Sequence, residues 1–415
     1  MAPSWKTDMW FVSPFNFAEE VRREFKTPKT LIVHDVTMRD GEGQAGVIFT
    51  KNEKLRIARA LERLGVDRVE VGIPSISMDD RDVLRALNAA KIKVKLVSWC
   101  RLNKVDVDVA ADLDSWGVTI ELPASRQAAE KLYGGSLEVF LEKAVEVGEH
   151  AKSRGLHVTF LCVDSSRSDL ETLEKVVKTV ESVADSIALS DTYGVLLPQA
   201  AFYLFKKLSE VSSKPLEAHC HNDFGLAAAN SLAAIAGGAQ VVHVSVNGIG
   251  ERAGNAPLAE VVLGAKLLLG VDVNLKLKEL RNVSRVVEEA SGVKVAPNKP
   301  VVGDNIFSVE SAQAGLWYAK AKESGDYTLA FPFRWDLVGF PGVRTTLSKK
   351  SGPVNVILKM QELNLPVDES KLPNILLMVA ETSIRKKAAL TDEEFLEILE
   401  ALGVKVPPTE SYVQG

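Results

Sequence analysis

Between residues 30 and 270, short runs of β-branched residues alternate with longer segments whose apolar residues recur at helical spacing. The runs are too apolar for a sheet with one solvated face, so parallel strands covered by helices fit best. The pattern predicts eight strands, at Leu31–Val36, Arg68–Ile73, Lys93–Val97, Val118–Leu122, His157–Cys162, Ser186–Ser190, Leu216–Cys220 and Val241–Val246.

Eight β/α units in roughly 240 residues match the size of a (β/α)8, or TIM, barrel. The strand count alone leaves an open, doubly wound sheet as an alternative. The barrel is favoured because no Gly-x-Gly-x-x-Gly motif follows the first strand. Lys51–Leu64 illustrates the helical pattern, with apolar residues on one stripe and charged residues outside, and Gly65 is expected to end it.

The pattern changes after Gly270. A helix is predicted over 275–290, and prolines then interrupt an irregular region. A last helix is predicted from a capping box formed by Thr391 and Glu394. We therefore expect three parts: an N-terminal arm (1–28), a barrel domain (29–275), and a linker with C-terminal subdomains (276–415), smaller and α/β or mostly helical. Aromatic residues are expected to anchor the arm, namely Trp5, Trp10 and Phe11.

The composition of the chain excludes several classes of protein function. The 415 residues carry 50 Lys and Arg against 55 Asp and Glu, a net charge of −5, which argues against a nucleic-acid partner bound by bulk positive charge. No apolar stretch approaches the length of a membrane helix, so no membrane association is expected. The first residues lack the pattern of a secretory signal, so a cytoplasmic location is expected. Three scattered cysteines cannot form a closed disulfide framework.

Polar residues follow two of the predicted strands, where a parallel barrel places its active site. The first strand leads into Arg39, Asp40 and Glu42, which form either a solvated loop or a charged substrate site. The seventh strand ends with His219 and His221, which strand alternation places on one face. Two imidazoles aimed at one point make a good platform for a divalent ion, although a hydrogen-bonded pair is the alternative.

A glycine-rich loop follows the eighth strand and ends at Asn255. Glycines let the backbone or a ligand approach closely. The Asn255 side chain would either supply a carbonyl oxygen to a metal or cap the next helix, and the sequence leaves both open.

Together these residues resemble the signature of the DRE-TIM metallolyase superfamily. The motifs are Asp35-Val-Thr-Met-Arg39-Asp40-Gly-Glu42, His219-Cys-His221-Asn-Asp223 and Asn247-Gly-Ile-Gly-Glu-Arg-Ala-Gly-Asn255. The last loop is similar to that of the branch that condenses an acyl-CoA with a 2-oxo acid, which includes isopropylmalate, homocitrate and citramalate synthases. The resemblance covers residues from about 30 to 400. Because the chain ends at 415, no C-terminal regulatory domain is expected.

The resemblance implies a role for each candidate residue. Metal binding (Mg²⁺, Mn²⁺ or Zn²⁺) falls to Asp40, His219, His221 and Asn255. Substrate binding falls to Glu70, Arg101 and Thr192, and catalysis to Arg39, Glu42 and Tyr327. The implied partners are a 2-oxo acid, an acyl-CoA and a second copy of the chain in a homodimer.

The chain also departs from this pattern. Ala314 stands where the synthases carry a histidine that helps deprotonate the acyl-CoA methyl, and no histidine follows His243. Gly43 and Val163 replace the glutamine and the glutamate that related enzymes place in the same pocket. The main hypothesis is a Claisen condensation of an acyl-CoA with a 2-oxo acid. The alternatives are a metal-dependent lyase that cleaves a 2-hydroxy or 2-oxo acid, and a non-catalytic paralogue.

Overall fold

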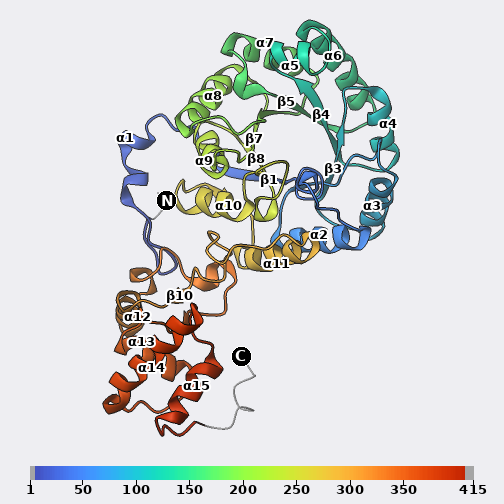
Figure 1. The fold of residues 1–415 in the computed structure, drawn as a ribbon. Coiled ribbons are helices and arrows are strands. Elements are labelled where there is room, and N and C mark those ends of the chain that lie inside the picture. The colour runs from blue at the N-terminus through green and yellow to red at the C-terminus, as the bar shows by residue number, and fades with distance from the viewer. Residues whose placement is uncertain (1–4, 407–415) are drawn as a thin grey trace. The chain divides into compact units, whose positions relative to one another are not determined.

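Eight parallel strands close into a barrel in the computed structural model, which describes residues 5–406 (Figure 1). The strands are β1 (Thr30–Asp35), β2 (Arg68–Glu70), β3 (Lys95–Cys100), β4 (Gly117–Pro123), β5 (His157–Val163), β6 (Ser186–Asp191), β7 (Leu216–Cys220) and β8 (Val241–Val244). Each strand pairs with the next, and β1 pairs in parallel with both β2 and β8. This closure confirms the predicted barrel and excludes the open sheet. A short ninth strand, β9 (Asp272–Val273), also pairs with β1.

Helices surround the barrel and cover its outer face (Figure 1). They are α2 (Lys51–Leu64), α3 (Met78–Ala89), α4 (Lys104–Asp112), α5 (Arg126–Lys131), α6 (Leu137–Ser153), α7 (Leu170–Val180), α8 (Pro198–Val211), α9 (Ala227–Ala236), α10 (Leu258–Leu267) and α11 (Leu280–Ser291). Apolar side chains between strands and helices form the main core, with fully buried Phe160 and Val176 among them. The strands are therefore covered on the outside, as the apolar runs predicted.

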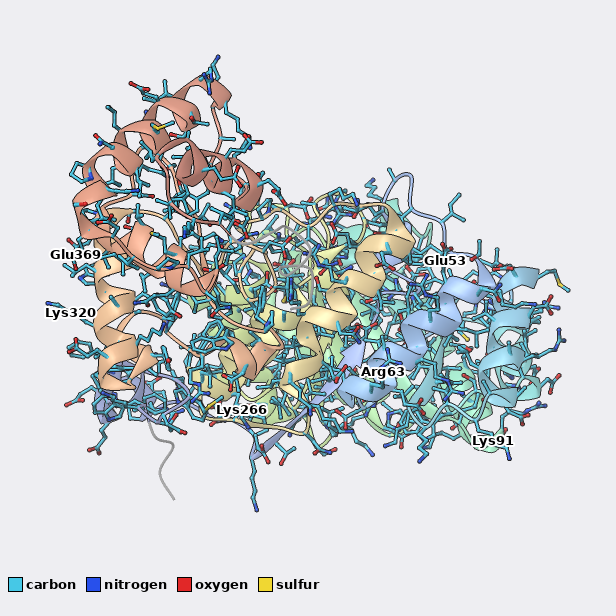
Figure 2. All side chains as sticks on the ribbon, turned by 90° about the horizontal axis from the view of Figure 1, so that it is seen from below. Glu53, Arg63, Lys91, Lys266, Lys320 and Glu369 are labelled. Carbon is cyan, nitrogen blue, oxygen red and sulfur yellow. The ribbon has the colours of Figure 1, made fainter. Side chains whose placement is uncertain are left out.

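The helix α2 has the predicted bounds. It begins with a capping box between Thr50 and Glu53, and Gly65 ends it with a φ of 97°. Glu53 in its first turn and Arg63 in its last turn complement the helix dipole, and both side chains lie on the outer surface (Figure 2).

The described chain forms two compact units, one containing Ser13–Val295 and the other containing Gly303 onward. The described N-terminal residues up to Val12 belong to the second unit. There Trp10 forms an isolated bridge with Phe333, and the rings of Trp5 and Phe11 lie 5.6 Å apart. The division at 28/29 and 275/276 stays a prediction.

The second unit is mostly helical. It contains α12 (Ala312–Ser324), α13 (Pro353–Glu362), α14 (Leu372–Lys386) and α15 (Asp392–Ala401), with one parallel pair of two-residue strands, β10 (Ser308–Val309) and β11 (Arg344–Thr345). The predicted capping box of Thr391 and Glu394 starts α15. The sequence interpretation missed α12, α13 and α14, and in α12 the few buried side chains do not define an apolar stripe.

The interior of the barrel is unusual because it holds ionisable side chains. A TIM barrel is normally filled with branched aliphatic residues. Here the inward-facing side chains that are at most 5% exposed include His34, Arg68, Glu70, Glu217 and His243. These residues lie below the carboxyl ends of the strands and support the site described next. Within the described residues, no helix is long and apolar enough to cross a membrane.

Candidate metal centre

Three predicted ligands meet at the carboxyl ends of β1 and β7. Asp40, in the loop after β1, places Oδ2 3.2 Å from His219 Nε2 and 3.8 Å from His221 Nε2. The two histidine Nε2 atoms lie 3.3 Å apart. All three side chains are buried. An ion with bonds of about 2.0–2.2 Å brings neighbouring ligand atoms to roughly 3–3.5 Å from one another, so the spacing fits a single ion.

Hydrogen bonds behind the two imidazoles set which nitrogen faces Asp40. His221 Nδ1 donates to the carbonyl of Gly254 at 3.3 Å, and His219 Nδ1 contacts His243 Nδ1 at 3.2 Å. Each Nε2 is therefore directed to the common point. Burial, helped by the charge of His219, lowers the pKa of His221 to about 4. Its imidazole is neutral at neutral pH, which is the form that binds metals.

Asp40 and Asn255 supply oxygens of the kind that a divalent ion needs. Burial alone would raise the pKa of Asp40, but Arg39 and His219 hold this pKa well below its usual range. Asn255 donates through Nδ2 to the carbonyl of Ile249 at 3.2 Å, while its Oδ1 is buried without a hydrogen-bond partner. Two imidazoles, a carboxylate and an amide oxygen are together a ligand set that suits a divalent ion.

The glycine-rich loop after β8 brings Asn255 to this point. Asn255 forms an antiparallel bridge with His221. Gly254 has a φ of 93°, and a Cβ on it would lie 1.9 Å from the Gly248 carbonyl oxygen, so only glycine fits. The helix α10 begins after Pro257 and has no side-chain cap, so the alternative that Asn255 caps it is wrong.

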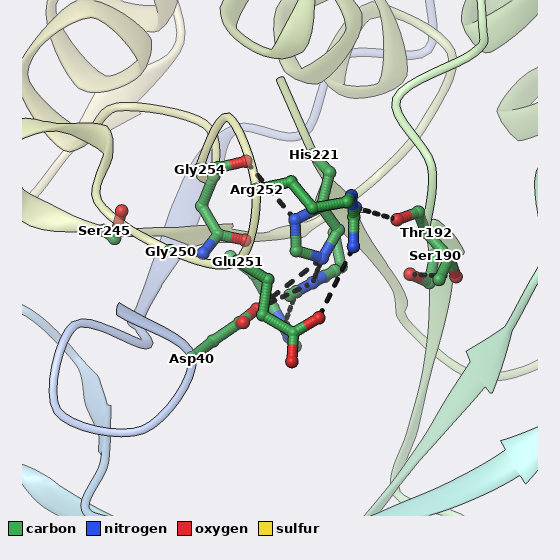
Figure 3. A network of polar contacts seen from close by, with 12 residues as sticks. Asp40, Ser190, Thr192, His221, Ser245, Gly250, Glu251, Arg252 and Gly254 are labelled. Atoms are coloured by element: carbon green, nitrogen blue, oxygen red, sulfur yellow. Dashed lines mark hydrogen bonds and ion pairs between the residues drawn. The ribbon is translucent and has the colours of Figure 1, made fainter. Parts of the chain in front are cut away.

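A charged residue of the same loop joins three strand ends. Arg252 donates to the Thr192 carbonyl at 2.6 Å, after β6, and to Asp223 Oδ1 at 2.9 Å, after β7. Figure 3 shows Arg252 extending toward Thr192, with the carboxylates of Glu251 and Asp40 below His221 in this view. The sequence analysis assigned no role to Arg252, although its position in the matched loop motif was a usable signal.

Arg39 lies beside the candidate ligands. Its Nε donates to the buried carboxylate of Glu70, and its Nη1 lies 3.8 Å from Asp40 Oδ2. Its Nη2 is buried without a hydrogen-bond partner. One nitrogen of the guanidinium is therefore available for a substrate oxygen. Glu70, which was predicted to bind substrate, contacts Arg39 and is fully buried.

The other predicted residues have partners elsewhere. Glu42 accepts a hydrogen bond from the Phe49 amide and pairs with Lys54 Nζ at 2.6 Å. Arg101 binds Asp106 through two nitrogens. The Thr192 hydroxyl donates to Ser190 at 2.9 Å and accepts from the Asp164 amide at 2.8 Å. In the second unit, the Tyr327 ring packs against Trp335 at 4.7 Å.

Glu121, at the end of β4, is a residue that the sequence analysis missed. Burial raises its pKa, although a hydrogen bond from the Tyr133 hydroxyl and the charge of Arg39 oppose this. Strand alternation alone gave no signal, because a lone carboxylate in an apolar strand can point to either face.

Comparison with known proteins identifies the family. Residues 30–287 match the HMGL-like family, so the chain belongs to that family. It is 38% identical over 385 residues to a homocitrate synthase from Methanopyrus kandleri, covering 92% of this chain and 95% of the relative. It is 37% identical over 397 residues to a probable 2-isopropylmalate synthase from Ignicoccus hospitalis, covering 94% and 96%.

A solved structure shares the fold. The hydroxymethylglutaryl-CoA lyase from Pseudomonas aeruginosa matches with a TM-score of 0.57 at 22% identity, over 65% of this chain and 95% of that one. This likeness concerns the barrel fold. The sequence relatives above cover nearly the whole chain, including the second unit.

Proposed function

We propose that this protein is a divalent-metal-dependent acyltransferase that condenses an acyl-CoA with a 2-oxo acid in a Claisen reaction. The observation that carries the proposal is the convergence of Asp40, His219 and His221, with Asn255, whose Oδ1 is buried without a partner, bridged to His221 through the backbone. Relatives named as synthases, similar over nine-tenths of the chain, support the same chemistry.

The ion, when bound, polarises the ketone of the oxo acid as a Lewis acid. In the proposed roles, Arg39 directs Nη2 at the oxygen on which negative charge develops, and its fixed charge stabilises that oxygen. Glu70 holds the Arg39 guanidinium in place through Nε. Thr192 is proposed to donate a hydrogen bond to the substrate carboxylate, and Arg101 is proposed to line the same mouth of the barrel, as the family resemblance implies.

Glu42 and Tyr327 are still proposed as catalytic residues, Glu42 on its contacts in the barrel and Tyr327 on the family resemblance. The Glu42 carboxylate is held by Lys54 and the Phe49 amide, so it orders the loop that carries Asp40. Tyr327 belongs to the second unit and is the proposed remaining member of the residue pair that handles the acyl donor.

The deciding experiment is a metal-replete screen that follows thiol release from a panel of acyl-CoAs with a panel of 2-oxo acids. A parallel screen for cleavage of the corresponding hydroxy acids separates synthase from lyase. Thiol release that requires both substrates and the ion supports the proposal. Cleavage without condensation would assign the protein to the lyase alternative.

We further propose that the protein is a cytoplasmic homodimer whose second unit contributes to activity. The basis is the resemblance of that unit to the synthase branch. Sedimentation of the full chain at micromolar concentration should give twice the monomer mass of 45.1 kDa. A monomer with full turnover would contradict this assembly.

A further inference from the structure

Two buried side chains, His243 on β8 and Glu217 on β7, lie behind His219 on the side away from Asp40. His219 Nδ1 lies 3.2 Å from His243 Nδ1, and His243 Nε2 lies 2.6 Å from Glu217 Oε2. The second oxygen of Glu217 accepts a hydrogen bond from Arg68 Nη1 at 2.7 Å. All four side chains are at most 5% exposed. These contacts form one continuous chain from β2 to the candidate metal centre.

Each contact in this chain determines where the next proton lies. A carboxylate paired with Arg68 offers only lone pairs, so His243 donates to Glu217 through Nε2–H. A neutral His243 then presents Nδ1 as an acceptor, and His219 donates to it through Nδ1–H. When an ion is bound, the lone pair of His219 is left on Nε2, which lies 3.2 Å from Asp40 Oδ2 and would ligate the ion.

We infer that Glu217 and His243 are positioning residues for the metal centre, because together they hold His219 in its metal-binding tautomer and orientation. This inference rests on the proposed metal site. Hydrogen bonds behind a ligating histidine fix its ring and increase its basicity, and losing them commonly weakens metal binding about 10- to 100-fold. Arg68 acts at the far end of the chain by compensating the buried charge of Glu217.

A competing explanation is a second ion held by His34, Glu217 and His243, whose ligand atoms lie within 4.8 Å of one another. The geometry favours the hydrogen-bonded chain. The 2.6 Å separation of His243 Nε2 and Glu217 Oε2 is a hydrogen-bond distance. Neighbouring ligands on one ion lie roughly 3 Å or more apart.

The first test measures Mn²⁺ binding to the full chain by titration calorimetry. His243→Phe and Glu217→Gln should each weaken binding by about 10- to 100-fold. His34→Phe is the matched control, since His34 is equally buried and its ring lies 4.3 Å from that of His243, yet it makes no hydrogen bond to His219. It should bind Mn²⁺ as the unaltered chain does. Equal losses in all three variants, or a second bound ion that His34→Phe removes, would overturn the inference.

The second test needs no substitution and so does not depend on the variants folding. In the unaltered chain labelled with ¹⁵N-histidine and loaded with diamagnetic Mg²⁺, a nitrogen–nitrogen coupling should join His219 Nδ1 to His243 Nδ1 across the hydrogen bond, with the proton on His219. A proton on His243 Nδ1 instead, or no coupling, would overturn the inference. Failure of the metal site itself is recognised separately, because the unaltered chain would then bind no Mn²⁺ in the calorimetric experiment.

Discussion

Arg39 donates through Nε to the fully buried carboxylate of Glu70, while Nη2 of the same guanidinium has no hydrogen-bond partner. The two ends of this side chain therefore differ. One end is held by the protein, and the other remains available beside Asp40, where the proposed reaction develops negative charge.

Replacing Arg39 by lysine should reduce kcat strongly while leaving Tm nearly unchanged. Lysine keeps the positive charge next to Glu70, but it loses the planar fork that serves two partners at once. The expected decrease in kcat is on the order of 10²-fold, the usual effect of losing one donor to a developing oxyanion. Steady-state kinetics and thermal unfolding test this. Arg85→Lys, on the outer surface of α3, is the control and should change neither quantity. Unaltered turnover in Arg39→Lys would refute the role.

Activity should depend on a divalent ion held by Asp40, His219 and His221. Exhaustive chelation should abolish turnover, and His219→Ala should abolish ion binding, because it removes one of the two nitrogen ligands of a buried site. His157→Ala is a suitable control, since His157 lies on β5 and stacks on Trp116. Metal analysis of the purified variants provides the measurement. Full activity after chelation would contradict the assignment.

The metal-free protein should lose stability as the pH falls from about 6.5 to about 4. The folded-state pKa of His221 is about 4, against 6.5 for an ordinary histidine, because burial disfavours the imidazolium. Below pH 6.5 the unfolded chain therefore binds a proton that the folded chain does not, so unfolding is favoured. The difference in pKa corresponds to a loss on the order of 3 kcal/mol from this residue.

Urea unfolding at pH 7.5 and pH 4.5 tests this effect. His157, whose pKa burial also lowers to about 4, contributes a loss of the same sign, so the comparison must be between variants. His221→Gln should lose less stability between the two pH values than the unaltered chain. An equal loss in both proteins would show that His221 does not carry the effect.

Much of the barrel was predictable because the strands are apolar on both faces. Predicted and observed bounds agree for Leu216–Cys220 and differ by a few residues elsewhere. The largest shift is at β3, predicted from Lys93 and observed over Lys95–Cys100, because Ser98 and Trp99 interrupt the aliphatic run although both belong to the strand. Closure could not be deduced, since it depends on β1 pairing with β8 across more than 200 residues of intervening chain.

The candidate metal ligands were predictable for a related reason. His219 and His221 are two positions apart on a strand, and this spacing alone places them on one face. The supporting residues were not predictable, because Arg68, Glu217 and His243 belong to three strands and their contacts depend on the stagger of the barrel. Only the face of Glu217 could have been predicted, because it lies two positions before His219 on the same strand. The sequence analysis did not use this signal.

The final prediction concerns the acyl donor. A condensing enzyme needs a base near the acyl carbon, and general-base catalysis commonly contributes about 10²- to 10⁴-fold in rate. Ala314, on α12, stands where the related synthases are expected to carry a histidine, and it cannot accept a proton. Tyr327 is the proposed remaining member of the pair that handles the acyl donor, and its ring packs against Trp335. We therefore expect little turnover of acetyl-CoA with 2-oxoisovalerate, 2-oxoglutarate or pyruvate, and a preference for donors with a more acidic carbon or for cleavage.

Introducing the histidine provides the sharpest test of this expectation. Ala314→His should raise turnover of acetyl-CoA with at least one of these three acids, because it restores an imidazole at the matching position of α12. Gln313→His, one residue earlier on an exposed position of the same helix, is the matched control and should give no increase. Thiol release under saturating Mn²⁺ measures both variants. The contrary outcome is that the unaltered chain condenses acetyl-CoA with one of the acids as fast as Ala314→His does. Position 314 would then not limit the reaction, and the proton acceptor would be another residue.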